Sequence, residues 1–128
     1  MFDHEKLDVY QLELNFIRWI TTLLMEIKRD HQPLCREVVD QVDRASLSAL
    51  LNTAEGNGRR STKQRAKFFD DARGSTTECA AGLDAIVAKG VCRPERIEEG
   101  KAMLERIVSM LTKLVARFED KPHGEQAS

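Results

Sequence analysis

The residues best suited to chemistry are five cations that lie close together near the middle of the chain. They are Arg59, Arg60, Lys63, Arg65 and Lys67. No acidic residue separates them, and the rest of the chain sums to a formal charge of −6. Guanidinium and ammonium groups gathered in this way bind phosphate oxygens, so the segment predicts contact with the backbone of RNA or DNA. The alternative is a solvated surface whose cations pair with nearby acids, namely Asp70, Asp71 and Glu119.

The aromatic residues that follow this segment bear on how a nucleic acid would be held. Phe68 and Phe69 are adjacent to the last cation, and we expect both rings to lie in a core. Base stacking of the kind that single-strand binders use is therefore not predicted. The expected mode of binding is contact with phosphates alone.

Histidines and cysteines, which could act as nucleophiles or metal ligands, are few and scattered. They are His4, His31, His123, Cys35, Cys79 and Cys92. None of the histidines pairs with a Cys or Ser at a spacing known from catalytic sites, and the Glu-x-x-His pairs of di-metal bundles are missing. His31 and Cys35 are four residues apart, but Pro33 lies between them and no further ligands cluster nearby. The sequence thus predicts no catalytic activity, no metal and no cofactor.

Composition limits the remaining possibilities. The chain has 128 residues, of which 41% are hydrophobic, 32% charged and only 5% aromatic, as expected of one helical domain. Its net charge of −1 provides no global attraction to nucleic acid or membranes. Three cysteines without a CxxC spacing favour a reducing cytoplasm. We expect no secretory signal and no membrane span, because the longest uncharged stretch, residues 45–54, is too short and too polar.

Local signals divide the chain into four helices, which we expect over residues 8–30, 33–55, 61–89 and 94–119. Asp8 with Gln11 and Ser61 with Gln64 form capping boxes, and Pro33 and Pro94 each open a helix. The run Gly56-Asn57-Gly58 predicts a turn, and Gly90 predicts a glycine helix end.

Short connections between long helices predict an all-α fold, the antiparallel up-down-up-down four-helix bundle, over residues 1–119. Residues 120–128 are polar and predicted to be disordered. Along residues 94–119, one apolar seam matches a bundle core, formed by Ile97, Leu104, Ile107, Leu111, Leu114 and Phe118.

The first helix has a wider apolar face than one core requires. One stripe contains Val9, Leu12, Phe16, Trp19, Ile20, Leu23 and Ile27. A second stripe beside it contains Tyr10, Leu14, Ile17 and Leu24. A monomer would expose part of this face, so the pattern predicts a homo-oligomer. The alternative is a helix wedged deeply into its own bundle, and Glu13 inside the apolar arc weakens the argument for assembly.

The second and third helices carry small residues at helical spacing, which permit close packing. These are Ala45, Ser48, Ala49 and Asn52, and Ala72, Ser75, Cys79 and Gly82. Arg44 is expected within reach of Asp71 or Glu78, as a polar clasp. Gly74 within a helix predicts close backbone approach or a kink.

The same two helices contain a set of motifs at residues 41–45, Ser48, Asn52, residues 54–59, residues 72–75 and Glu78. These motifs resemble a bacterial family, the four-helix-bundle proteins encoded within intervening sequences of 23S rRNA genes. Residues 6–11 and Pro33 also match, so the similarity covers about residues 6–90, and the fourth helix matches only in pattern. The departures are Asp43, where the family more often has a basic residue, and Ala49 and Thr53, where it has larger apolar ones.

The resemblance implies a four-helix protomer in a ring-like homo-oligomer, typically a pentamer, without established catalytic activity. The fold is also similar to that of accessory proteins of diversity-generating retroelements, which suggests RNA or DNA binding by analogy. The positions carried over as a structural motif, expected to hold the central hairpin together, are Arg44, Asn52, Glu55, Gly56, Gly58, Gly74 and Glu78.

Three functions follow from these patterns. The first is a non-enzymatic homo-oligomer that binds rRNA or other nucleic acid weakly through the five cations. The second is a protein interaction scaffold without a nucleic-acid role, which the near-neutral charge favours. The third is a small-molecule binder with a polar pocket near Arg44, Glu55 and Glu78.

Overall fold

The computed structural model describes residues 1–31 and 33–119, and the secondary structure there is helical throughout. The long helices are α1 (Asp8–His31), α2 (Arg36–Gly58), α3 (Thr62–Ala88) and α4 (Glu98–Glu119). Two short 3-10 helices, η1 (Asp3–Lys6) and η2 (Pro94–Ile97), precede α1 and α4. The all-α prediction is confirmed, whereas the tail predicted at 120–128 lies outside the described residues.

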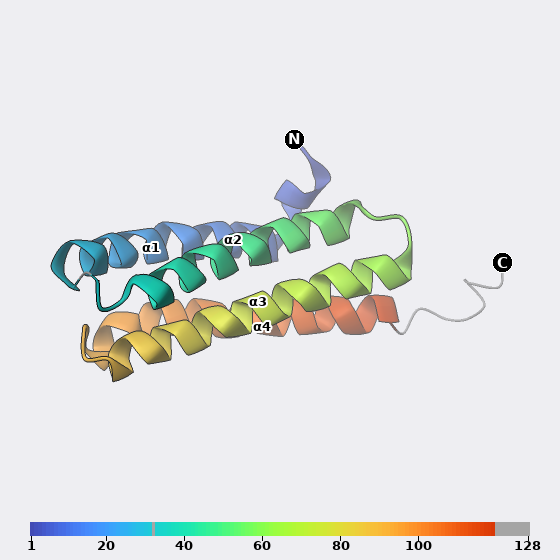
Figure 1. Ribbon diagram of the computed structural model, residues 1–128. Helices are drawn as coiled ribbons and strands as arrows, with labels where there is room; N and C mark the ends of the chain where they lie inside the picture. Colours follow the sequence, from blue (N-terminus) through green and yellow to red (C-terminus); the bar gives the residue numbers. More distant parts are fainter. Residues whose placement is uncertain (32, 120–128) are drawn as a thin grey trace.

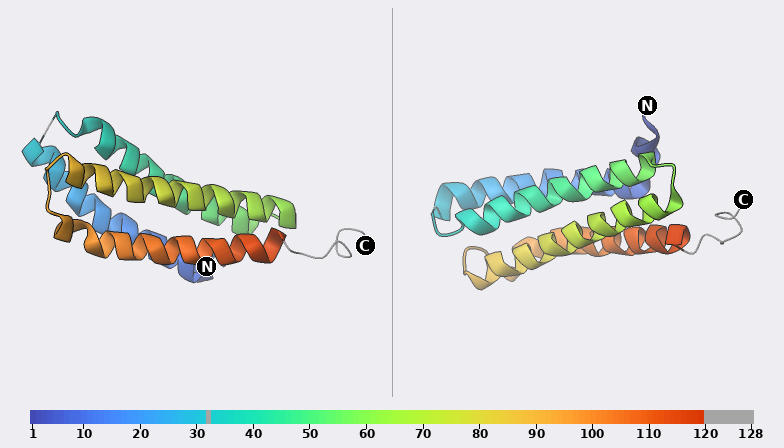
Figure 2. Two further views of the ribbon diagram at one scale, coloured as in Figure 1. Left: turned by 90° about the horizontal axis from the view of Figure 1, so that it is seen from below. Right: turned by 45° about the vertical axis from the view of Figure 1, so that its right-hand side comes forward.

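The four long helices lie side by side and alternate in direction, which is the predicted up-down-up-down bundle (Figure 1). α1 packs against α2 and α4, and α3 packs against the same two helices. The views of Figure 2 show the four long helices running alongside one another, and each pair of sequential helices is in contact. Side chains from all four helices meet in a single core, whose most buried members include Ile20, Leu23, Val39, Val42, Phe69, Leu83, Ile86, Ile107 and Leu111.

The bundle has two ends, and the α2–α3 connection lies at the same end as the N-terminus (Figure 1). We call this end the basic pole, because residues 59–67 form it. The opposite end, the far pole, contains the turn after α1 and the loop after α3.

α1 begins at the predicted residue, but not through the predicted cap. Asp8 is already helical, and the backbone N–H of Gln11 donates to the Leu7 carbonyl at 3.2 Å. The Gln11 side chain donates instead to the Glu5 carbonyl at 3.0 Å, which ties α1 to η1. The capping box predicted between Asp8 and Gln11 is therefore wrong, because the preceding 3-10 turn already supplies the partners.

Both ends of α2 lie three residues later than predicted. Pro33 does not open the helix, since Pro33 to Cys35 form a turn closed by the Arg36 N–H donating to the Pro33 carbonyl at 3.1 Å. At the other end Gly56 and Gly58 are helical, so the predicted turn at these glycines is also wrong. A Cβ on Gly56 would lie 3.1 Å from Phe68 Cβ and the Phe69 ring, so the missing side chain permits close packing on α3.

The ends of α3 are as predicted, because local hydrogen bonds determine them. The Ser61 hydroxyl oxygen accepts from the Gln64 N–H at 3.2 Å and caps the helix. Gly90 has a φ of +77°, and its N–H donates to the Val87 carbonyl while that of Val91 donates to the Ile86 carbonyl. This is a Schellman ending, in which glycine is favoured at the left-handed position.

Two expectations about helix interiors need correction. A Cβ on Gly74 would meet nothing within 4 Å, so this glycine marks no close approach. In α4, Leu104, Ile107 and Leu111 are buried as predicted, but Leu114 and Phe118 are only half-buried and Val115 is buried in their stead. The chain after Pro94 starts with η2 and continues as α4 from Glu98.

The wide apolar face of α1 is divided between the core and the surface. Val9, Leu12, Phe16, Ile20, Leu23, Leu24 and Ile27 are buried, together with Glu13. Tyr10, Leu14, Ile17 and Trp19 are half-buried, so the second stripe is covered only in part by its own bundle.

Candidate nucleic-acid interface

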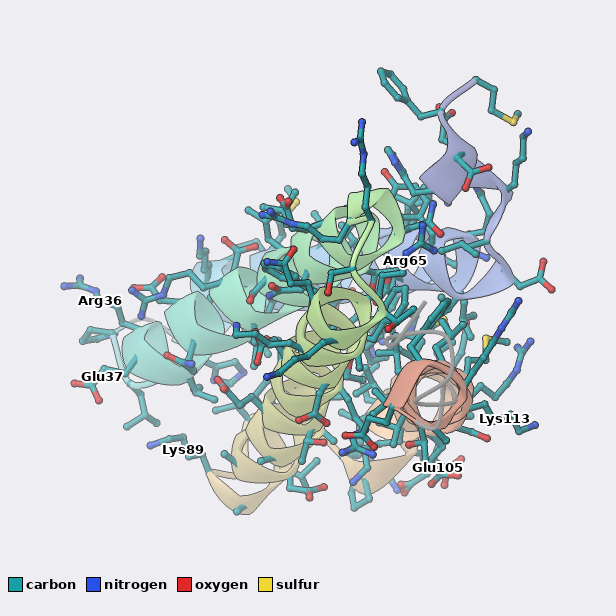
Figure 3. The ribbon with its side chains drawn as sticks, turned by 90° about the vertical axis from the view of Figure 1, so that its right-hand side faces the viewer. Arg36, Glu37, Arg65, Lys89, Glu105 and Lys113 are labelled. Carbon is teal, nitrogen blue, oxygen red and sulfur yellow. The ribbon has the colours of Figure 1, made fainter. Side chains whose placement is uncertain are left out.

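The structure places all five predicted cations at the basic pole. Arg59 and Arg60 follow the last residue of α2, and Lys63, Arg65 and Lys67 lie in the first two turns of α3. Figure 3 looks onto this end of the bundle, with Arg65 between the α2–α3 connection and the end of α4. The Ser61 cap fixes where α3 begins and therefore which side of the helix each cation occupies.

Arg59 is held by its neighbours. Its guanidinium forms an ion pair with Glu55 at 2.7 Å, one helical turn earlier, and lies 4.8 Å from the centre of the Phe68 ring. Its Nε is buried without a hydrogen-bond partner among the described residues. Arg59 therefore has a defined position and only part of its charge is available to a ligand.

Arg65 and Lys67 are also engaged within the chain. The Arg65 Nε donates to the Arg59 carbonyl at 2.6 Å, and Lys67 pairs with Asp71 at 2.9 Å. The predicted alternative of charge pairing is thus confirmed for Lys67. Asp70 pairs with Arg73 of the same helix and not with one of the five cations.

Arg60 and Lys63 differ from the other three. Both side chains are exposed, as is that of Lys67, but none of the ion pairs found within residues 1–31 and 33–119 includes Arg60 or Lys63. Accessible cations without a neutralising partner are the groups best placed to meet phosphate oxygens.

The expectation that both phenylalanines belong to the core is only half correct. Phe69 is 1% exposed, but Phe68 is half-buried and lies beneath Arg59 and Lys67. Phe118 of α4 is also half-buried, and Arg65 and Arg117 lie over its ring. Sequence reasoning missed Phe118 and Arg117 as parts of the site because they are far from the cation cluster along the chain.

Only part of the predicted motif joins α2 to α3, namely Glu78 and Gly56, together with residues that lie beside the motif. The Ser48 and Ser75 hydroxyls lie 3.0 Å apart, and Asn52 donates to the Ser48 carbonyl at 2.9 Å. Gln41, which was not predicted as a partner, donates to Glu78 at 2.8 Å. Arg44 reaches Gln41 at 3.5 Å and not an acid, so the clasp is a network of neutral and charged groups.

The pocket predicted near Arg44, Glu55 and Glu78 does not converge. Arg44 and Glu78 both contact Gln41, whereas Glu55 lies further along α2, about 16 Å from Arg44 at the helical rise. Glu55 is instead part of the basic pole through Arg59. A Cβ on Gly58, the remaining motif glycine, would meet nothing within 4 Å, so no close packing depends on this position.

The described residues offer little other chemistry. They contain no group of three or more His, Cys, Asp and Glu side chains that could hold a metal ion. Burial raises the pKa of the Cys79 thiol to about 12 and also raises the pKa of Cys92, which disfavours their thiolates. None of the helices in the described part combines the length and hydropathy needed to cross a bilayer.

The fold and site define a class, a small four-helix bundle with a cationic pole at one end and a hydrogen-bonded central hairpin. The model of the 23S rRNA-intervening sequence protein family matches residues 5–113. The chain belongs to this family, and the match extends the resemblance seen in the first three helices into the fourth. No curated protein matches the chain.

Proposed function

We propose that this protein is a non-enzymatic homo-oligomer that binds the phosphate backbone of RNA or DNA through its basic pole. The observation that supports this function is the pair of accessible cations, Arg60 and Lys63, which lack an ion-pair partner among the described residues. Arg59, Arg65 and Lys67 lie beside them and add to the local positive potential. Membership of a family named for 23S rRNA intervening sequences makes rRNA the first nucleic acid to test.

Binding by one subunit is expected to be weak and dependent on salt. The net charge of the chain is −1, so attraction is confined to the pole and is screened within about 10 Å at 0.1 M salt. The logarithm of the binding constant falls linearly with the logarithm of the salt concentration, and each phosphate that the protein neutralises makes this slope more negative by about 0.7 to 0.9. Two free cations per subunit therefore predict a slope of about −2 for one pole.

Self-association would repeat this pole and strengthen binding. Leu47 and Leu51 of α2 are 51% and 57% exposed, which is high for leucine on a bundle helix. They lie on the outer side of α2, and the contact of Thr53 with Glu13 places this part of α2 at the height of the half-buried Leu14 and Ile17 of α1. We call these four leucine and isoleucine residues the apolar flank, and a second copy is the proposed partner. The resemblance suggests a ring of five.

The nucleic-acid function is tested by reversing the two free cations. We expect Arg60→Glu with Lys63→Glu to weaken binding to rRNA fragments at least about tenfold and to make the salt slope shallower by about 2 per pole. The matched control reverses two exposed cations at the far pole, Arg36→Glu with Lys89→Glu, which changes the net charge equally (Figure 3). Equal loss in both variants, or no binding of the parent protein at low salt, would contradict the proposal.

A protein interaction scaffold is the second candidate, and a groove at the far pole favours it. The groove is lined by Pro33, Leu34, Arg36, Glu37, Val38, Gln41 and Lys89, and Leu34 is 63% exposed. If this function is correct, a partner captured from lysate remains bound after nuclease treatment and is lost from Leu34→Asp. Loss of the partner on nuclease treatment would instead favour the nucleic-acid function.

We further propose that the protein acts in a reducing cytoplasm. Cys35, Cys79 and Cys92 are free thiols, and two of them are buried, which fits a compartment where disulfides do not form. Recovery of the protein in the cytoplasmic fraction, with all three thiols titratable after denaturation, is the expected result.

A further inference from the structure

The basic pole contains two aromatic rings, each covered by two cations. Arg59 and Lys67 lie 4.8 and 4.9 Å from the centre of the Phe68 ring. Arg65 and Arg117 lie 5.3 and 5.4 Å from the centre of the Phe118 ring. Both rings are half-buried, so each retains some access to solvent. The Phe118 ring also packs on Phe69 of the core, with 5.8 Å between the ring centres. Core packing does not explain why two cations lie over each ring, and phosphate contact alone requires no aromatic groups.

The covered rings are held in place by the fold. Gly56 lets α2 approach Phe68, and the Glu55 ion pair at 2.7 Å fixes Arg59 beside that ring. The Arg65 Nε donates to the Arg59 carbonyl at 2.6 Å, which connects the two rings across the end of the bundle. Because these guanidinium groups are already ordered, a ligand that stacks on them loses less side-chain entropy on binding.

A cavity adjoins the second ring. It has a volume of about 260 Å³ and lies between the start of α3 and the end of α4. It is lined by Thr62, Lys63, Ala66, Lys67, Asp70, Phe118 and Glu119. It therefore places an aromatic wall beside Lys63, one of the two cations without an ion-pair partner among the described residues.

We infer that the basic pole recognises unpaired RNA, with bases stacked at the Arg59–Phe68 and Phe118 sites and phosphates bound by Arg60 and Lys63. In a duplex the flat faces of the bases are occupied by neighbouring base pairs, and only edges, sugars and phosphates are accessible. Unpaired bases can stack on aromatic rings and guanidinium planes. This inference rests on the proposed function and specifies which form of nucleic acid the same surface selects.

The test compares a short fluorescent single-stranded RNA of mixed sequence with the same strand annealed to its complement, at one salt concentration. We expect the full chain to prefer the single strand. Phe68→Leu and Phe118→Leu, made singly and together, should each lower single-strand affinity about fivefold or more and leave duplex affinity unchanged. Phe68→Tyr with Phe118→Tyr keeps both ring faces and should retain the preference. Helicity and the unfolding midpoint identify any variant that has lost its fold.

The charge variant separates this inference from the proposed function. Arg60→Glu with Lys63→Glu should weaken binding to the single strand and the duplex alike, because both present phosphates. Equal affinity of the parent protein for the two probes, or loss of the preference in the tyrosine variant as well as the leucine variant, would overturn the stacking inference and leave phosphate binding intact. Absence of binding to either probe at low salt would overturn both.

Discussion

Glu13 is the residue whose chemistry the fold alters most. Its side chain is 2% exposed, and Thr53 donates a hydrogen bond of 2.7 Å to Oε2. Oε1 is buried without a partner in the described part of the chain. Burial raises the pKa of the Glu13 carboxyl to about 8, although the Thr53 hydrogen bond acts in the opposite direction. At neutral pH Glu13 is therefore mainly a neutral acid inside an apolar arc.

This shift makes the free energy of unfolding depend on pH. The unfolded carboxyl has a pKa of 4.5, whereas the folded one keeps its proton until about 8. Between these values unfolding releases a proton, so rising pH favours the unfolded state. Stability should fall progressively over this window, by at most about 4 to 5 kcal/mol at about 1.36 kcal/mol per pKa unit. Urea unfolding at a series of pH values across the window measures the slope.

Glu13→Gln is the matched control for this prediction. The amide has nearly the same shape, can accept from Thr53 and does not titrate, so the slope should flatten while the fold persists. The same fall in stability in the parent protein and the variant would contradict the assignment to Glu13.

The helix ends show how far the sequence predicts the elements. Ser61 and Gly90 were predicted correctly because their hydrogen bonds involve residues close to each other in the chain. The end of α2 is not predicted correctly, because Gly56 remains helical where α3 packs against it. This contact joins two helices and therefore depends on tertiary structure, which local sequence signals do not describe. Local propensity for a turn at the two glycines was overridden by packing.

The same distinction applies to the candidate site. The five cations are close together in sequence, so their clustering could be predicted without a structure. Their partners could not, since Arg65 meets Phe118 of α4 and Arg59 meets Phe68 across the α2–α3 connection. Which side chains meet between two helices depends on the face that each helix turns toward the other. The periodicity of the sequence defines the position of a residue along that face only to within one helical turn.

α3 contains two glycines whose surroundings predict opposite effects of the same substitution. Gly74→Ala adds a Cβ in open space on a helix, so it should stabilise the fold by about 0.5 to 1 kcal/mol. Gly82→Ala adds a Cβ that collides with Cγ2 of the fully buried Val42, so it should destabilise by about 1 to 3 kcal/mol. Chemical denaturation of both variants measures the difference, and a stabilised Gly82→Ala would show that α2 and α3 can separate without cost.

At the scale of the molecule, three surfaces have different compositions. The basic pole is cationic, the far pole has an open groove with an exposed Leu34, and the apolar flank runs along α1 and α2 between them. Assembly through the flank would leave both poles accessible, because the four flank residues lie within α1 and α2 and not at the ends of these helices. A ring built in this way would display one basic pole per subunit on the same side.

This geometry predicts that assembly and nucleic-acid affinity change together. Leu47→Glu with Leu51→Glu places two charges on the apolar flank without disturbing the core, since both leucines are more than half exposed. The mass measured by light scattering should fall to that of one 14.5 kDa chain. Leu34→Glu, at a still more exposed leucine outside the flank, should leave the oligomer intact. Because simultaneous contacts multiply affinity, the dissociated variant should bind a long RNA at least about a hundredfold more weakly, although each pole is unchanged. A parent protein that is monomeric, or a dissociated variant with undiminished affinity, would contradict the link between the flank and the pole.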